Sequence, residues 1–183
     1  MKILEEKTIH DGFLKIVEGQ VEDNGKQFTR LKIVRPSVVA AILYNEDTEM
    51  FLLAQQYRYP IGSYNLEVVA GYIDEGETPM EAMKREILEE TGYKIESIEE
   101  LCYFHTSPGV SNELIYGFIG VVKNSDRVST GGGLASENES IVLRELTRAE
   151  LITAITSNML KDAKTVILAQ RMLLNKITSF IKL

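Results

Sequence analysis

Three glutamates lie close together on a predicted helix: Glu86, Glu89 and Glu90. Glu86 and Glu90 share one face, because residues four positions apart are neighbours on a helix. Carboxylates at the edge of a buried face repel one another and raise one another's pKa unless a cation lies between them. Glutamate oxygens are hard ligands that suit Mg²⁺ or Mn²⁺. The pattern therefore indicates a divalent-cation site, with a solvated acidic face, the more common role of a charge run, as the alternative.

The element that carries these glutamates is predicted to be a helix over residues 79–91. Thr78 and Glu81 match a capping box with Pro79 at the first helical position. Gly92 is a typical helix terminator. An apolar stripe beside the glutamates should face the core, and it consists of Met80, Met83, Ile87 and Leu88.

The full pattern runs from Gly71 through Glu77 to residues 85–93, which read Arg-Glu-Ile-Leu-Glu-Glu-Thr-Gly-Tyr. It resembles the Nudix box of the Nudix hydrolase superfamily, from which Tyr93 departs because an aliphatic residue is usual there. In that superfamily the box is a loop–helix–loop that holds divalent cations. The resemblance implies an α+β Nudix fold, an α/β/α sandwich with a mixed sheet, and Mg²⁺ or Mn²⁺ as cofactor.

The resemblance also implies roles for single residues. The expected metal ligands are the carboxylates of Glu86, Glu90, Glu89 and Glu139 and the backbone carbonyl of Ala70. Glu89 would be an additional ligand or a water-bridged neighbour. Arg85 would orient the carboxylates through charge-assisted hydrogen bonds, and a plain surface ion pair is the alternative for it. Glu77 would brace the loop.

Segments outside the box resemble the ADP-ribose pyrophosphatase group of this superfamily. They are Gln55–Pro60, Leu66–Gly71, Thr106–Glu113 and Gly133–Ile141, so the likeness covers most of residues 26–180. It implies a set of substrate-binding residues that consists of Arg30, Arg58, Glu139 and Pro108. The two arginines would hold the pyrophosphate, because a guanidinium presents a planar fork to phosphate. Charge on a strand surface is the alternative for both.

The catalytic residues implied by the resemblance are Glu137, Glu90, Glu89 and Arg85. Glu137 and Glu139 follow the run 129–133, Ser-Thr-Gly-Gly-Gly, whose composition predicts a mobile loop that brings them toward bound substrate. We assign Glu137 as the general base and Glu139 as a ligand, and the reverse assignment stays open. A solvated acidic loop is the alternative.

The expected reaction is divalent-metal-dependent hydrolysis of ADP-ribose to AMP and ribose 5-phosphate. Many relatives carry Trp at the position of Leu66, whereas this chain has no Trp. The residues that would bind the base and the terminal sugar are therefore not assigned. GDP-mannose or another nucleotide sugar is the alternative substrate, and an inactive Nudix-like sensor or an RNA pyrophosphohydrolase is a more remote one. Tyr57, Phe28 and Tyr103 could stack on a base, but core packing is their more common role.

Strands and further helices surround this helix in the sequence. Residues 2–10, 13–21 and 28–34 read as strands, with Asp23-Asn24-Gly25 as a hairpin turn. Residues 1–36 therefore form an N-terminal antiparallel β arm, and the resemblance implies that it forms a homodimer. Residues 37–183 form the Nudix domain. Its strands are expected at 37–43, 50–55, 98–104, 114–122 and 141–146, and its other helices after Thr147 and over 163–181.

Composition narrows the class of partner. The 183 residues include 20 Lys+Arg and 27 Asp+Glu, a net charge of −7, which argues against binding to nucleic acid or anionic membranes. The single Cys102 excludes a disulfide framework and a Cys-based zinc site. No apolar run is long enough to span a membrane, and no signal-peptide pattern is present. We therefore expect a cytoplasmic protein that acts on a small nucleoside diphosphate derivative.

Overall fold

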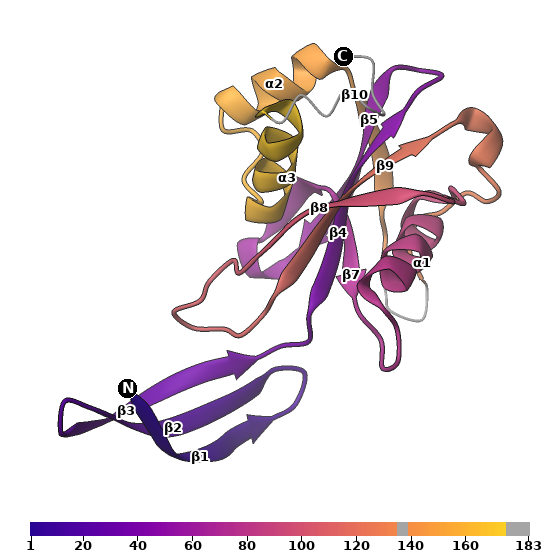
Figure 1. Ribbon diagram of the computed structural model, residues 1–183. Coiled ribbons are helices and arrows are strands. Elements are labelled where there is room, and N and C mark those ends of the chain that lie inside the picture. Colours follow the sequence, from indigo (N-terminus) through magenta and orange to yellow (C-terminus); the bar gives the residue numbers. More distant parts are fainter. Residues whose placement is uncertain (135–138, 175–183) are drawn as a thin grey trace. The chain divides into compact units, whose positions relative to one another are not determined.

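The computed structural model describes residues 1–134 and 139–174, and backbone contacts divide the chain into two compact units (Figure 1). The first unit comprises Met1–Ser37 together with His105–Leu114, and the second comprises Val38–Phe104 together with the chain from Ile115 onward. The sequence had placed residues 105–114 with the larger domain. In the structure they join the N-terminal strands instead.

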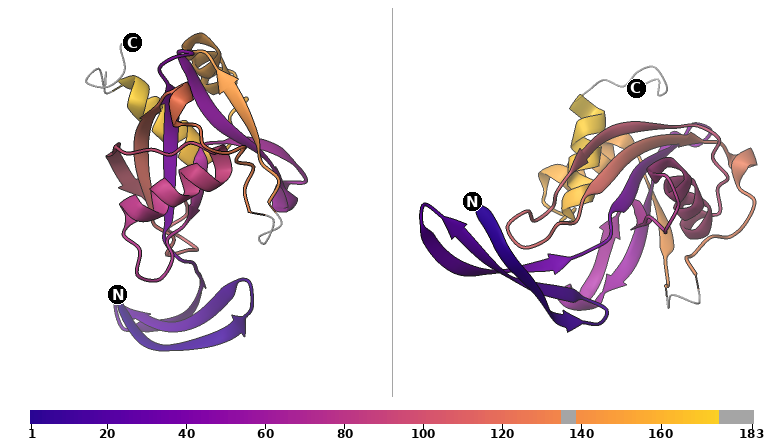
Figure 2. Two further views of the ribbon diagram at one scale, coloured as in Figure 1. Left: turned by 90° about the vertical axis from the view of Figure 1, so that its right-hand side faces the viewer. Right: turned by 60° about the horizontal axis from the view of Figure 1, so that its bottom comes forward.

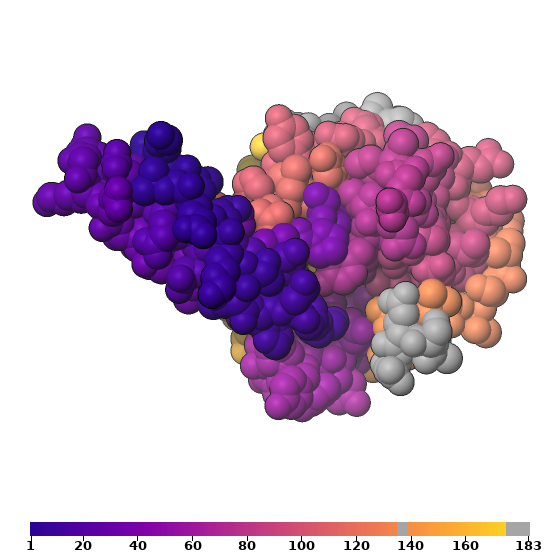
Figure 3. Space-filling model, turned by 90° about the horizontal axis from the view of Figure 1, so that it is seen from below, coloured from indigo at the N-terminus to yellow at the C-terminus, as the bar shows by residue number. Residues whose placement is uncertain are grey.

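Three antiparallel strands form the sheet of the first unit: β1 (Lys2–Asp11), β2 (Lys15–Asp23) and β3 (Lys26–Val34). Between β2 and β3, Asn24 and Gly25 both have positive φ angles, 50° and 75°. This geometry matches the predicted hairpin turn, because tight hairpin turns need left-handed residues and Asn-Gly supplies them. All residues of β1 are exposed, and indigo atoms of the N-terminal segment lie at the surface in the space-filling view (Figure 3).

The segment 105–114 is attached to the end of β3 by backbone and side-chain hydrogen bonds. The Ile33 N–H donates to the Val110 carbonyl over 2.8 Å. The Asn112 side chain accepts from the Arg35 N–H (2.9 Å) and donates to the Arg35 carbonyl (3.1 Å). The Pro108 loop is therefore fixed to the strand that also carries Arg30.

The second unit is built on a seven-stranded mixed sheet of order β10-β5-β4-β9-β8, with β6 added to β5 and β7 added to β4. Its strands are β4 (Val38–Asn45), β5 (Met50–Arg58), β6 (Ser63–Glu67), β7 (Val69–Tyr72), β8 (Ile98–Phe104), β9 (Ile115–Val122) and β10 (Val142–Leu146). Its helices are α1 (Pro79–Thr91), α2 (Arg148–Thr156) and α3 (Ala163–Leu174), with short 3-10 turns at Tyr59–Ile61 and Asn124–Asp126. β4 pairs in parallel with β9 and antiparallel with β5 and β7.

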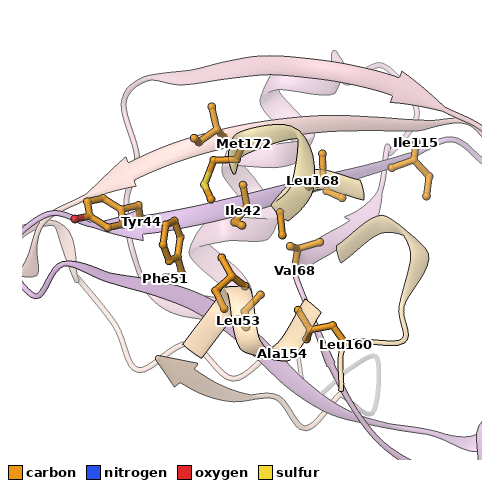
Figure 4. Packing of buried hydrophobic residues seen from close by; sticks show 14 of the residues in the cluster. Ile42, Tyr44, Phe51, Leu53, Val68, Ile115, Ala154, Leu160, Leu168 and Met172 are labelled. Atoms are coloured by element: carbon orange, nitrogen blue, oxygen red, sulfur yellow. The ribbon is translucent and has the colours of Figure 1, made fainter. Parts of the chain in front are cut away.

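Helices cover both faces of this sheet, with α1 on one face and α2 and α3 on the other (Figure 2). Ile42 and its even-numbered neighbours in β4 pack toward Leu168 and Met172 of α3, as Figure 4 shows. The odd-numbered residues of β4 pack with Met83 and Ile87 of α1. A strand that is buried on both faces has no solvent-facing side for polar residues, which explains the continuous apolar run in β4. Helices on both faces of the sheet confirm the predicted α/β/α sandwich.

Helix α1 begins and ends as the sequence predicts. Thr78 and Glu81 form a complete capping box, and Gly92 ends the helix in the left-handed conformation with φ 77°. The predicted apolar stripe is wrong in part, because Met80 and Leu88 are exposed. The residues that α1 buries are Ala82, Met83, Ile87, Glu90 and Thr91. The buried face is therefore rotated toward Glu90, which places this carboxylate inside.

Strands β6 and β7 differ from the expectation, and the expected end of α3 lies outside the described residues. Strands β6 and β7 were not predicted, because glycine, proline and asparagine interrupt the apolar pattern around them. A second capping box at Thr147 and Glu150 opens α2, as expected. Helix α3 begins at Ala163 as predicted, whereas its expected end at residue 181 lies outside the described residues. None of the described helices is long and apolar enough to cross a membrane.

Candidate active site

Helix α1 lies along β7 (Figure 1), and two of its glutamates meet the backbone at Ala70 and Gly71. The Glu86 carboxylate lies so close to Gly71 that a Cβ there would be 2.0 Å from it. A side chain at Gly71 would therefore displace the Glu86 carboxylate from its present position. The Ala70 backbone hydrogen-bonds to Glu90, and this contact lowers the Glu90 pKa against larger opposing effects. The structure thus brings together Ala70, Glu86 and Glu90, as the sequence predicted for a metal site.

Glu90 is buried, and the contacts around it do not offset the cost of burying its charge. Its Oε2 atom is buried and has no hydrogen-bond partner among the residues that the structure describes. Burial, followed by the charges of Glu86 and Glu139, raises the pKa of Glu90 well above its usual range. A buried carboxylate oxygen without a partner is costly, and a cation bound there would remove the cost. The oxygen-only donors of Glu86, Glu90 and the Ala70 carbonyl fit a hard divalent ion.

Arg85 forms hydrogen bonds with the carboxylates of Glu86, Glu89 and Glu77. Its Nη1 donates to Glu86 Oε1 (2.7 Å) and to Glu89 Oε2 (3.2 Å). Its Nε and Nη2 donate to the two oxygens of Glu77, each over 2.9 Å, and Nη2 also reaches the Tyr72 carbonyl. The contacts are those of a charge-assisted network rather than a lone surface ion pair.

Burial raises the pKa of Glu86 to about 7, while the Arg85 guanidinium opposes this rise and the charges of Glu89 and Glu139 add to it. Within residues 1–134 and 139–174, no three acidic, His or Cys side chains are already gathered in metal-binding geometry. Arg85 is the group that neutralises Glu86 and Glu89 in this arrangement. Glu86 and Glu89 are therefore held near each other by Arg85. That they form a complete set of metal ligands with the other expected groups stays a prediction.

Glu139 faces the same carboxylates. Its charge raises the pKa of both Glu86 and Glu90, and its Oε2 accepts a long hydrogen bond of 3.4 Å from the Leu134 N–H. Glu137 lies outside the described residues. The choice between Glu137 and Glu139 as base therefore stays a prediction.

The glycine run before Glu139 is packed against the C-terminal end of α1. The Gly132 N–H donates to the Glu90 carbonyl (2.8 Å), and the Gly133 N–H donates to the Glu89 carbonyl (3.1 Å). A Cβ on Gly131 would lie 2.6 Å from the Glu90 carbonyl oxygen. The sequence predicted a mobile loop here from composition. The run itself is instead tied by its backbone to the turn that carries the metal-site glutamates.

Arg58 joins the site through a network that the sequence did not indicate. Its Nε and Nη2 donate to the two oxygens of Glu67 over 2.8 and 2.9 Å, and Lys164 binds the same carboxylate. Arg58 also interacts electrostatically with Glu90, because the two charges influence each other's pKa. Glu67 and Lys164 are 97 positions apart, so no local pattern connects them.

The other expected binding residues, Arg30 and Pro108, lie in the first unit. Arg30 lies over the Phe28 ring, 4.3 Å from its centroid, and Pro108 lies in the loop fixed to β3. The expectation that Tyr57 and Tyr103 are core residues is wrong, because their side chains are 50% and 68% exposed. Tyr57 contacts Tyr64 edge-on instead. The roles of Arg30, Arg58 and Pro108 in substrate binding stay predictions.

Comparisons with known proteins identify the family. A family model described as the NUDIX domain matches residues 34–168. The methanol dehydrogenase activator of Bacillus methanolicus is 35% identical over 176 residues, which cover 92% of this chain and 93% of that protein. The GDP-mannose pyrophosphatase of Cronobacter sakazakii is 33% identical over 78% of this chain and 76% of its own.

Two further relatives agree with this result. The ADP-ribose pyrophosphatase of Bacillus subtilis is 30% identical over 90% of this chain and 91% of its own. A crystal structure of an ADP compounds hydrolase shares the fold, with a TM-score of 0.80 at 20% identity, over 94% of this chain and 91% of that one. The box residues, the sandwich fold and these matches agree, and the chain belongs to the Nudix family of pyrophosphohydrolases.

Proposed function

We propose that this protein hydrolyses the pyrophosphate of ADP-ribose to AMP and ribose 5-phosphate, with Mg²⁺ or Mn²⁺ as cofactor. The observation that carries the proposal is the buried, unpartnered Oε2 of Glu90 beside Glu86, Glu139 and the positive charge of Arg58. An acidic site with an adjacent arginine suits a cation and the phosphates that it attracts. The similarity to an ADP-ribose pyrophosphatase supports this substrate.

Different side chains of this protein would bind the ion, bind the phosphates and accept the proton. The groups that would hold the ion are the carboxylates of Glu86, Glu89, Glu90 and Glu139 and the carbonyl of Ala70. When bound, a divalent ion offsets the charge of the phosphoanhydride and lowers the pKa of a water molecule. Arg85 fixes Glu86 and Glu89 through the hydrogen bonds described above. Arg58 and Arg30 would donate to phosphate oxygens, and Glu137 would accept the proton of the attacking water.

GDP-mannose is the second candidate substrate. The relative from Cronobacter sakazakii is named for it and is slightly more identical to this chain than the ADP-ribose relative. The same carboxylates and Arg58 would act on either pyrophosphate, because that group is common to both molecules. The two substrates differ in their base and sugar, so discrimination would come from other residues.

A substrate panel tests the proposal. ADP-ribose, GDP-mannose, other nucleotide sugars and a dinucleotide are each incubated with the protein and Mg²⁺ or Mn²⁺, and the products are separated and identified. The expected result is release of AMP from ADP-ribose at the highest kcat/KM, dependent on the ion. Higher kcat/KM with GDP-mannose would transfer the assignment to that substrate. Absence of hydrolysis across the panel would overturn the proposal in favour of a Nudix-like sensor.

A further inference from the structure

The first turn of helix α3 is built into the site through a buried lysine. The Lys164 side chain is 12% exposed, and its Nζ binds Glu67 Oε2 and, over 3.0 Å, Asp162 Oδ1. Glu67 is itself 5% exposed. Buried lysines and glutamates are rare unless they are paired, so this contact is a specific feature of the fold rather than a surface ion pair.

The position of Lys164 is fixed from two sides. Asp162 caps α3, because its Oδ2 accepts from the Thr165 N–H (2.9 Å) and the Thr165 hydroxyl (2.6 Å). The Thr165 hydroxyl oxygen in turn accepts from the Val68 N–H over 2.9 Å. The start of α3 is therefore bonded to the chain immediately after Glu67, which keeps the backbone of Lys164 near that carboxylate.

Glu67 connects Lys164 to Arg58. Arg58 donates hydrogen bonds to both oxygens of the Glu67 carboxylate. The Arg58 side chain is 43% exposed. The Nε and Nη2 edge of its guanidinium is thus fixed by Glu67, while the charges of Arg58 and Glu90 act on each other. Any anion bound beside Glu90 would meet an arginine whose orientation Glu67 sets.

Lys164 adds a second cation to the Glu67 carboxylate. Asp162 pairs with Lys164 in turn, so Arg58, Glu67, Lys164 and Asp162 together are neutral. Lys164 therefore acts on Arg58 through geometry rather than through net charge. A carboxylate shared by two cations also has less freedom to rotate than one held by a single partner.

We propose that Lys164 is a positioning residue for phosphate binding, which acts through Glu67 to hold the Arg58 guanidinium in its orientation. The inference deepens the proposed function and rests on it for the identity of the phosphate compound. It concerns a residue of helix α3 that would not itself touch the substrate.

The test compares Lys164→Met, Lys164→Arg and, as a matched control, Lys161→Met at an exposed lysine three positions earlier. KM and kcat are measured with ADP-ribose and Mg²⁺, and the dissociation constant of inorganic pyrophosphate is measured by calorimetry. K164M should raise KM and weaken pyrophosphate binding by about tenfold, with a smaller change in kcat. K164R should restore most of the affinity, and K161M should match the wild type.

Thermal unfolding of each variant accompanies these measurements. Should K164M not fold, Lys164→Gln replaces it, because the amide keeps a neutral donor beside Glu67 while it removes the charge; the same direction of change is expected. Wild-type KM and pyrophosphate affinity in a folded K164M or K164Q, with only a lower Tm, would overturn the inference. If the wild type binds pyrophosphate but hydrolyses no ADP-ribose or GDP-mannose, the proposed function fails, and the variants' pyrophosphate affinities still decide the inference.

Discussion

Glu90 shows how a single residue can favour function over stability. Its carboxylate is buried with one oxygen unpartnered, and the neighbouring Glu86 and Glu139 add like charge. Such a group destabilises the fold when it is ionised. The proposed cation would account for a glutamate at this position, because the packing of α1 alone would be better served by a neutral side chain.

Replacing Glu90 by Gln should therefore separate activity from stability. We expect Glu90→Gln to lower kcat by about two orders of magnitude or more, while Tm stays the same or rises, because the substitution removes a buried charge. Steady-state kinetics with Mg²⁺ and thermal unfolding without added metal measure the two effects. The exposed Glu99→Gln is the control, and near-normal turnover in E90Q would contradict the metal assignment.

The pKa of Glu67 is lowered, whereas that of Glu90 is raised. This lowered pKa predicts how stability depends on pH. Burial raises the pKa of this carboxyl, but Arg58 and Lys164 outweigh burial and lower the pKa to about 2. Because the pKa is lower in the folded than in the unfolded chain, the ion pairs stabilise the fold above the unfolded pKa of about 4.3, and this stabilisation is lost as the pH falls toward 2.

The Tm of Glu67→Gln should therefore lie well below that of the wild type at neutral pH, and the gap should narrow between about pH 5 and pH 2. Thermal unfolding of both proteins across this range, at constant ionic strength, measures the gap. A gap that is constant with pH would mean that the Glu67 charge contributes nothing and that the loss is one of packing alone.

At the scale of elements, the C-terminal end of α1 and the glycine run 131–133 form one backbone-bonded piece. Gly131 has φ 65° and no room for a Cβ, whereas Gly62 has φ 61° and open space around it. Gly131→Ala and Gly62→Ala thus carry a similar conformational cost, and only the first adds a collision with the backbone of α1.

We expect Gly131→Ala to lower both Tm and kcat more than Gly62→Ala does, because the collision displaces the last turn of α1, with Glu90, from the chain that leads to Glu139. Thermal unfolding and kinetics with a saturating divalent ion measure the difference. Equal losses in the two variants would show that only the φ angle matters and that the contact with α1 has no effect on activity.

The elements that could be predicted are those whose signal is local. The capping boxes at Thr78 and Thr147 and the continuous apolar run of β4 needed no partner to be recognised. The stripe on α1 was misjudged at Met80 and Leu88, because the sheet, not the helix, decides which side is covered. The Glu67–Lys164 contact joins β6 to α3 across 97 positions. No local sequence pattern around either residue predicts such a long-range ion pair.

At the scale of the whole molecule, the N-terminal sheet has little core of its own. Within it, Val17 and Val21 are buried, whereas Ile3, Phe13 and Leu31 are among its exposed apolar residues. A three-stranded sheet needs an apolar face packed against something to be stable, and an exposed strand edge invites pairing. We propose that residues 1–36 form a dimerisation arm and that a second copy of the chain covers these residues.

The protein should therefore be a homodimer at micromolar concentration, as measured by size-exclusion chromatography with light scattering. Ile3→Asp combined with Leu31→Glu should shift the mass toward the monomer, because charge on an apolar contact surface opposes association. Met159→Lys, an exposed apolar residue of the second unit, is the matched control and should leave the mass unchanged. A wild type that elutes as a pure monomer would refute the dimer, and the exposed apolar residues of the arm would then need another partner to account for them.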